Sequence, residues 1–151
     1  MKFSDAINDI PYTKKHILQD VTVTGIKFNS KDIVPGDIFV AMKGQTTDGH
    51  HYISDAIAAG ATALIVENTD LLDATNLPYA VITNARAALG IIADKIYGAP
   101  SKKMNTICVT GTNGKTTSVT LAAGIYNKAG YNAASIGTLG AFFNGQYVDI
   151  R

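Results

Sequence analysis

The chain has 151 residues, enough for one ordinary domain or for a small domain followed by part of another. Hydrophobic residues make up 46 % of it, which argues against a disordered chain. The 13 basic and 12 acidic side chains nearly balance, which argues against a general nucleic-acid binder, since such proteins usually carry a basic excess. There is one cysteine, no apolar run near the ~20 residues that cross a bilayer and no apolar signal segment at the start, so we expect a soluble cytoplasmic protein with neither membrane nor nucleic-acid partners.

Strands and helices alternate through the first hundred residues. Pro35-Gly36-Asp37 is a turn signal before an apolar run, Asp48 is suited to cap a helix, and Gly60 is suited to end it. The predicted strands span residues 21–28, 38–42, 61–66 and 79–83. The predicted helices span residues 3–9, 51–59 and 85–97. This alternation predicts an α/β layer fold with a largely parallel sheet.

The pattern restarts after a polar stretch. A strand at 106–110, a helix at 115–129 and a strand at 133–136 predict one βαβ unit. Asn144-Gly145 lies between short apolar pairs and predicts a two-residue hairpin turn. We therefore divide the chain into a first domain of residues 1–98, a linker of 99–104 and the start of a second domain at 105–151.

A glycine-rich segment, Gly111-Thr112-Asn113-Gly114-Lys115-Thr116, separates the predicted strand and helix of that unit. Backbone N–H groups of such a turn and of the following helix form an anion site, and the two glycines let the backbone approach phosphate oxygens. The lysine would reach the terminal phosphates of a nucleoside triphosphate, and the Thr116 hydroxyl would bind Mg²⁺. The segment therefore predicts a phosphate-binding loop.

Two observations count against this interpretation. The usual loop has a glycine five residues before its second glycine, and here that position is Val109. The only carboxylate after Lys103 is Asp149, whereas enzymes that use a magnesium nucleotide usually carry acids beyond the loop. The structural alternative is a strand-to-helix turn with a solvated Lys115.

Longer segments resemble a known family. Residues 109–117 resemble the ATP loop of the Mur ligases, which build the peptide stem of bacterial peptidoglycan, and the shorter glycine spacing is that family's own variant. Residues 28–41, with Pro35-Gly36-Asp37-Ile38-Phe39-Val40-Ala41, and residues 44–50 resemble two further family segments in the right order. Within the family, the Thr-Asn-Gly-Lys-Thr-Thr motif is most similar to that of the branch that adds the third stem residue.

The resemblance implies an ATP-dependent ligase that adds lysine or diaminopimelate to UDP-N-acetylmuramoyl-L-alanyl-D-glutamate through an acyl phosphate. It implies Lys115 as the catalytic residue, ATP and Mg²⁺ as cofactors, and Thr116 as a metal ligand. The implied ATP-binding residues are Gly111, Thr112, Asn113, Gly114, Lys115, Thr116 and Thr117. The implied contacts to the UDP-muramoyl-dipeptide are Phe28, Ser30, Gln45, Thr46 and Thr47.

The family has three domains, and the resemblance covers the UDP-substrate domain and the opening βαβ unit of the P-loop ATP-binding domain. We accordingly expect an N-terminal fragment that is inactive alone and self-associates through an incomplete second domain. Two alternatives remain open: a non-catalytic module that binds a UDP-sugar peptide, and another Mur-type or unrelated phosphate-loop ATPase. Which third residue is added is also open.

Two other positions carry reactive side chains. Adjacent histidines on a helix point about 100° apart, so we interpret His50 and His51 as a surface pair at a helix N-terminus and not as a metal site. Cys108 lies in the apolar run before the loop, and we interpret it as a small core residue.

Overall fold

The structure is a computed structural model that describes residues 1–44, 46–72 and 75–148. The chain forms two compact units, Met1–Asn105 and Thr106–Arg151, and each is described by itself. Among the residues that the structure describes, no helix is long and apolar enough to cross a membrane.

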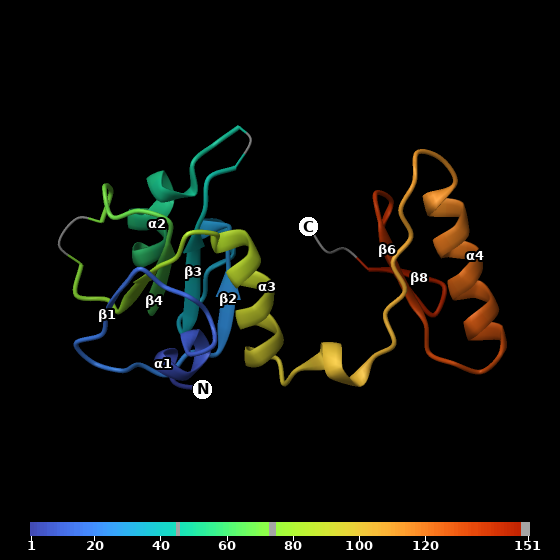
Figure 1. Cartoon of the computed structure of the whole chain (residues 1–151), viewed down its shortest axis with the longest axis horizontal. Coiled ribbons are helices and arrows are strands. Elements are labelled where there is room, and N and C mark those ends of the chain that lie inside the picture. The colour runs from blue at the N-terminus through green and yellow to red at the C-terminus, as the bar shows by residue number, and fades with distance from the viewer. Residues whose placement is uncertain (45, 73–74, 149–151) are drawn as a thin grey trace. The chain divides into compact units, whose positions relative to one another are not determined.

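The first unit is built on a five-stranded sheet in the order β1-β5-β4-β3-β2 (Figure 1). β2, β3, β4 and β5 are parallel, and β1 is antiparallel to β5. The strands are β1 (Lys14–His16), β2 (Gly25–Lys27), β3 (Asp37–Ala41), β4 (Ala63–Val66) and β5 (Tyr79–Val81). The helical elements are α1 (Phe3–Ile7), η1 (Ser30–Asp32), η2 (Gly49–Tyr52), α2 (Ile53–Ala58), α3 (Ala85–Ile96) and η3 (Pro100–Lys103). The predicted α/β fold with a largely parallel sheet is confirmed.

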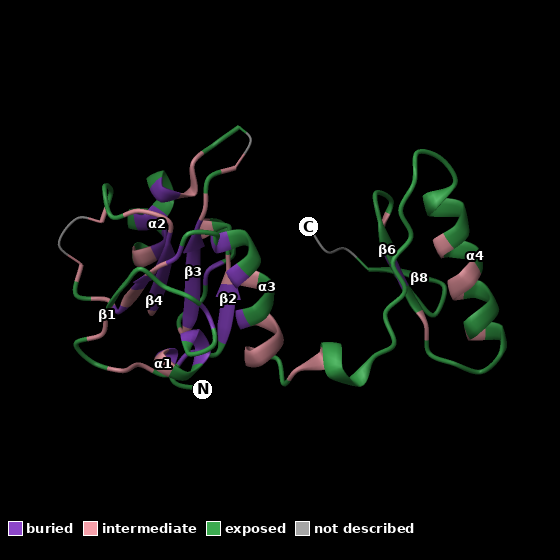
Figure 2. Cartoon of the chain, in the orientation of Figure 1, coloured by how far each residue is buried: buried purple, intermediate pink, exposed green. Residues whose placement is uncertain are grey.

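Both faces of this sheet are covered, and its central strands β3 and β4 are apolar at every position except Asp37, the buried first residue of β3. Along β3, Ile38 and Val40 face the cluster that contains α1 and α3, whereas Phe39 and Ala41 face the cluster that contains α2. All four side chains are fully buried, as the purple strands in Figure 2 show. A continuous apolar run is what a parallel strand with two covered faces requires.

The predicted elements of this unit are present, and β2, β4 and β5 are shorter than predicted, whereas β1 was not predicted. The strand predicted for 21–28 is reduced to β2, because Val21 and Val23 pair with the N-terminus instead: Phe3 N donates to Val21 O at 3.0 Å and Val23 N to Met1 O at 2.8 Å. The helix predicted for 51–59 is the 3₁₀ turn η2 followed by α2. Gly60 ends it at φ +105°.

The segment predicted as a linker is attached to α3. Ala99 N donates to Asp94 O at 2.7 Å, and Ser101 N donates to the Asp94 carboxylate at 2.9 Å. η3 follows directly, with Ala99 at φ 54° before Pro100. Residues 99–104 therefore continue the first unit, up to Asn105.

The second unit combines one helix with an antiparallel sheet in the order β6-β7-β8. Its elements are α4 (Lys115–Lys128), β6 (Ala134–Gly137), β7 (Gly140–Phe143) and β8 (Gln146–Val148). Asn144 at φ 49° and Gly145 at φ 76° form the turn between β7 and β8. The predicted Asn-Gly hairpin is confirmed, because two positive φ angles define the turn type that this pair favours.

The prediction of a βαβ unit is wrong for the described residues of this unit. Residues 106–110 belong to no strand, and β6 pairs antiparallel with β7, with Ala134 opposite Phe143 and Gly137 opposite Gly140. The physical reason is that antiparallel strands can be joined by a tight turn, as β6 and β7 are. The predicted parallel pair would be joined by the helix, and parallel sheets occur mainly where both faces are covered.

Candidate functional site

The predicted phosphate loop leads directly into α4. Gly111 has φ +146° and Gly114 has φ +77°, a backbone conformation that side chains with a Cβ rarely adopt. Gly114 is the N-cap of the helix, and no side chain caps it. The first bond of the helix runs from Ser118 N to Gly114 O at 2.9 Å. The N–H groups of residues 115–117 therefore have no partner within the helix, which leaves them for an anion.

The lysine of the loop is held by the loop backbone. Lys115 Nζ donates to the carbonyl oxygens of Gly111 and Thr112, the latter at 3.3 Å. Its ammonium group therefore lies at the loop and is not freely solvated, although the side chain is exposed. Lys115 and Thr116 also line a hollow whose other wall is formed by residues 135–140 and Phe142. A cation, a hydroxyl and free N–H groups thus share the N-terminal end of α4.

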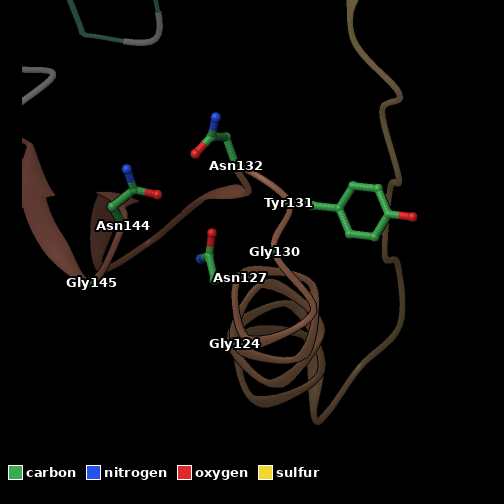
Figure 3. A pocket seen from close by; sticks show the side chains of 7 residues that line it. All are labelled: Gly124, Asn127, Gly130, Tyr131, Asn132, Asn144 and Gly145. Atoms are coloured by element: carbon green, nitrogen blue, oxygen red, sulfur yellow. The ribbon is translucent and has the colours of Figure 1, made fainter.

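A second hollow lies at the opposite end of the same helix (Figure 3). The Asn127 amide there is engaged with the backbone, since it donates to Ala133 O at 3.1 Å and accepts from Ala133 N at 2.9 Å. The Tyr131 ring points away from Asn127 and Asn144 in the close-up. This hollow is lined by Gly124, Asn127, Gly130, Tyr131, Asn132, Asn144 and Gly145. None of these side chains is charged, so we do not assign it to the nucleotide.

The residues predicted to contact the UDP end follow two neighbouring strands. Phe28 and Ser30 come directly after β2, and Thr46 and Thr47 lie in the loop after β3; Gln45 lies outside the described residues. Because β2 and β3 are parallel, both segments lie at the carboxyl edge of the sheet, where open α/β sheets bind ligands. Phe28 is 60 % exposed, and Ser30 is half-buried at the start of η1.

The loop after β3 is closed at its base by backbone pairing between its two sides. Lys43 and Asp48 form an isolated antiparallel bridge, and Gly49 N donates to Met42 O at 3.0 Å. Nearer the tip, Gly44 N donates to Thr47 O at 2.9 Å. A Cβ on Gly49 would lie 2.9 Å from both the nitrogen and the oxygen of Met42, so this position requires a glycine.

Two interpretations of single residues are corrected here. His50 is not a surface residue: it is 2 % exposed, whereas its neighbour His51 is exposed. Its Nδ1 lies 2.6 Å from the Asp48 carboxylate. The predicted capping role of Asp48 is confirmed by a separate contact, because the same carboxylate accepts from the His50 backbone N–H at 2.9 Å at the start of η2. Cys108 is exposed and not a core residue, because residues 106–110 do not enter a sheet.

These contacts shift the titration of Asp48. The backbone N–H of His50, and then its ring, hold the pKa of the Asp48 carboxyl below its usual value. Sequence reasoning missed this cluster and also Glu67, whose carboxylate accepts from Lys43 N at 3.2 Å and from Ala85 N at 3.1 Å. One available signal was that Glu67 is the only glutamate in the chain and directly follows a buried strand. Within the described part of the chain, no three acidic, histidine or cysteine side chains gather as a metal cluster would need.

The comparisons with known proteins agree with one another. Residues 22–99 match the model of the Mur ligase family, catalytic domain. The chain is 36 % identical over 140 residues to the UDP-N-acetylmuramoyl-L-alanyl-D-glutamate--2,6-diaminopimelate ligase of Cytophaga hutchinsonii, which covers 92 % of the chain and 29 % of that protein. It is 40 % identical over 116 residues to the ligase of the same name from Chlorobaculum tepidum, and this match covers 77 % of the chain and 23 % of that protein.

Solved structures show the same likeness. A UDP-N-acetylmuramoyl-L-alanyl-D-glutamate--2,6-diaminopimelate ligase superposes with a TM-score of 0.72 at 24 % identity, over 98 % of this chain and 30 % of that one. The MurF ligase of Thermotoga maritima in complex with ADP superposes with a TM-score of 0.54 at 27 % identity, over 70 % of this chain and 24 % of that one. The chain thus spans less than a third of the length of these relatives. The family match over residues 22–99 shows that the chain belongs to the Mur ligase family.

Proposed function

We propose that this chain supplies the UDP-substrate domain and the ATP loop of a ligase that joins 2,6-diaminopimelate to UDP-N-acetylmuramoyl-L-alanyl-D-glutamate. The observation that carries the proposal is the loop at the start of α4, with its two positive-φ glycines, its uncapped helix end and the ammonium of Lys115. The choice of diaminopimelate over lysine rests on the names of the relatives.

The loop suits a triphosphate on physical grounds. N–H groups at a helix N-terminus and a lysine ammonium both favour negative charge, and Gly111 and Gly114 remove the Cβ atoms that would crowd an oxygen. Thr117 and Thr112 add exposed hydroxyls. Mg²⁺ would be held by the Thr116 hydroxyl together with phosphate oxygens, since oxygen ligands are the ones it prefers.

The edge of the first sheet suits the UDP end of the substrate. Thr46 and Thr47 are exposed hydroxyl residues at the loop tip, and hydroxyls and the amide of Gln45 are suited to a uracil edge and a pyrophosphate. The exposed ring of Phe28 offers an apolar face on the neighbouring segment. Ser30 adds a further hydroxyl beside it.

In the proposed reaction, ATP phosphorylates the D-glutamyl carboxylate, and the amine of the incoming amino acid attacks the resulting acyl phosphate and releases phosphate. Lys115 would stabilise negative charge on the transferred phosphoryl group. Because no carboxylate occurs between Lys103 and Asp149, residues 106–148 contribute no acid to a metal site. We therefore expect the 151-residue chain to bind nucleotide without completing the reaction.

The test compares two lysines of one helix. Lys115→Ala should weaken binding of a non-hydrolysable ATP analogue by about tenfold or more and leave binding of UDP-N-acetylmuramoyl-L-alanyl-D-glutamate unchanged, as measured by titration calorimetry. Lys128→Ala, at the far end of α4, is the matched control and should change neither affinity. Equal losses for both ligands in Lys115→Ala would contradict the assignment.

A second measurement tests the catalytic part of the proposal. The chain is incubated with ATP, the muramoyl-dipeptide and diaminopimelate, and tripeptide product and phosphate are quantified. No turnover is expected from residues 1–151, and turnover that Lys115→Ala abolishes would show that the residues present already suffice for catalysis.

A further inference from the structure

The imidazole of His50 is buried with both ring nitrogens engaged. Nε2 accepts from Glu67 N at 3.0 Å and lies 3.4 Å from Asn68 N, and backbone N–H groups can only donate. Nε2 is therefore unprotonated, so the ring proton is on Nδ1 and points to the Asp48 carboxylate at 2.6 Å. This arrangement leaves no lone pair on the ring for a metal ion or for proton transfer with a substrate.

His50 and Glu67 hold the two sides of the loop base. One side is Asp48, whose carboxylate accepts from the His50 ring and from His50 N. The other side is Lys43, whose N–H donates to the Glu67 carboxylate at 3.2 Å. Lys43 and Asp48 are the pair that closes the base, so each partner of the bridge has its own side-chain support.

Both supports converge at the end of β4. The backbone N–H of Glu67 donates to His50, and the second carboxylate oxygen of Glu67 accepts from Ala85 N, the first residue of α3, at 3.1 Å. The loop base is therefore attached to the end of a buried strand and to the start of the long helix of the unit. A loop without such supports would sample several shapes at its tip.

We infer that Asp48, His50 and Glu67 are positioning residues, which hold Thr46 and Thr47 of the loop after β3 in the arrangement that meets the UDP end of the substrate. The inference rests on the proposed function for its ligand and on the contacts above for its mechanism. His50 acts through Asp48, and Glu67 acts through Lys43. His50 itself does not touch the substrate in this arrangement, because its ring is buried.

The first test measures binding of UDP-N-acetylmuramoyl-L-alanyl-D-glutamate to the full chain. His50→Leu removes both ring contacts, and Glu67→Gln keeps the shape of the side chain but replaces one acceptor oxygen by an NH₂ group. Each should raise the Kd about three- to tenfold, the equivalent of one hydrogen bond that no longer orders the loop. His50→Asn, which retains a donor toward Asp48, should fall between His50→Leu and the wild type. His51→Leu is the matched control and should leave the Kd unchanged, because His51 is exposed.

The second test needs no ligand. Heteronuclear NOE values of the Thr46 and Thr47 amides should fall in His50→Leu and Glu67→Gln and stay at wild-type values in His51→Leu. Ile53→Val changes a buried core residue of α2 and so controls for a general loss of stability. It should leave the NOE values of both amides unchanged. Long-range ¹⁵N spectra of the wild type should show His50 protonated at Nδ1.

The outcomes separate the inference from the proposed function. If the wild type does not bind the muramoyl-dipeptide, the substrate assignment fails, and the NOE values still decide whether the network orders the loop. If His50→Leu does not fold, Glu67→Gln and His50→Asn carry the test. Wild-type NOE values and wild-type Kd in Glu67→Gln and His50→Asn would overturn the inference.

Discussion

The two units of the chain contain helices of similar length with different burial. α3 has 12 residues and buries Ala85, Ala88 and Ile92, whereas α4 has 14 residues and buries none. Figure 2 shows the same contrast, with buried strands in the first unit and mostly exposed residues from 106 to 148. Secondary structure thus forms in both units from local sequence, but only in the first does a covered sheet give the apolar side chains a place to pack.

The second unit instead exposes apolar side chains along α4 and its sheet. Leu121 is 61 % exposed, Ile125 68 % and Ile136 69 %. Apolar surfaces of this kind mark contact sites or aggregation risks. The expected self-association of this unit therefore stays a prediction, and the matched pairs of substitutions below test the contrast on which it depends.

The largest expected effect is on the free energy of unfolding, when a buried phenylalanine of the first unit and an exposed one of the second are each replaced by alanine. Phe39 in β3 is fully buried, and Phe39→Ala should lower the free energy of unfolding of the first unit by about 3–5 kcal/mol, since it removes a core side chain and leaves a cavity. Phe143 in β7 is 46 % exposed, and Phe143→Ala should cost under about 1 kcal/mol. Urea denaturation followed by NMR peaks of each unit measures both. Equal losses would contradict the difference in packing.

The next effect is on cleavage by trypsin near the ends of the two helices. Lys95 lies in the last turn of α3 and pairs with Asp9 at 2.8 Å, and Lys128 lies in the last turn of α4. Cleavage at Lys128 should be faster by on the order of a hundredfold, because α3 opens only when the core opens. Mass spectrometry of timed digests gives both rates. Comparable rates would show that α4 is as well anchored as α3.

The sequence predicts the fold of the first unit because its signals are local and mutually consistent. Continuous apolar runs identify β3 and β4, and Gly60 ends α2 where its own φ of +105° excludes most other residues. The second unit shows the limit of such signals. The run at 106–110 has the composition of a buried strand, but a strand also needs neighbours, and pairing partners cannot be deduced from composition.

The candidate site is predictable to a different extent in each unit. The loop at residues 111–116 is visible in the sequence because its glycines have a fixed spacing before a helix. The network of His50 and Glu67 is not, because the two residues are 17 positions apart and only the parallel pairing of β3 and β4 brings them together. Long-range contacts of single polar side chains therefore require the fold first.

A smaller effect is expected from two strand glycines. A Cβ on Gly25 would lie 2.1 Å from the Asp37 carboxylate oxygen, whereas a Cβ on Gly137 would meet nothing within 4 Å. Gly25→Ala should destabilise the first unit by about 1–3 kcal/mol, because Asp37 is buried and must move. Gly137→Ala should be neutral or stabilising by a few tenths of a kcal/mol. Thermal unfolding followed by circular dichroism and by NMR compares the two, and a loss in Gly137→Ala would reveal a contact in the second unit.

The smallest effect is the response to acid, which should be confined to the first unit. The Ser4 hydroxyl, 2.7 Å from the Asp20 carboxylate, and the Ser4 backbone N–H, 3.1 Å from it, hold the pKa of Asp20 below its usual value. A carboxyl whose folded pKa lies below its unfolded pKa stabilises the fold at pH values above the unfolded pKa, and this contribution disappears as the pH falls through the folded pKa. Residues 106–148 contain no carboxylate and have no such contribution to lose.

Amide protection factors, followed from pH 7 down to about pH 3, would resolve this response by unit. Protection around α1 should fall at the acid end, and protection in α4 should not. In Asp20→Asn the stability at neutral pH should be slightly lower and the fall on acidification smaller, because the amide cannot titrate. Asp55→Asn, an exposed carboxylate on α2, is the matched control and should follow the wild type. An acid-dependent loss in α4 equal to that in α1 would show that the two units unfold together, and the contrast drawn from their burial would then not extend to their stability.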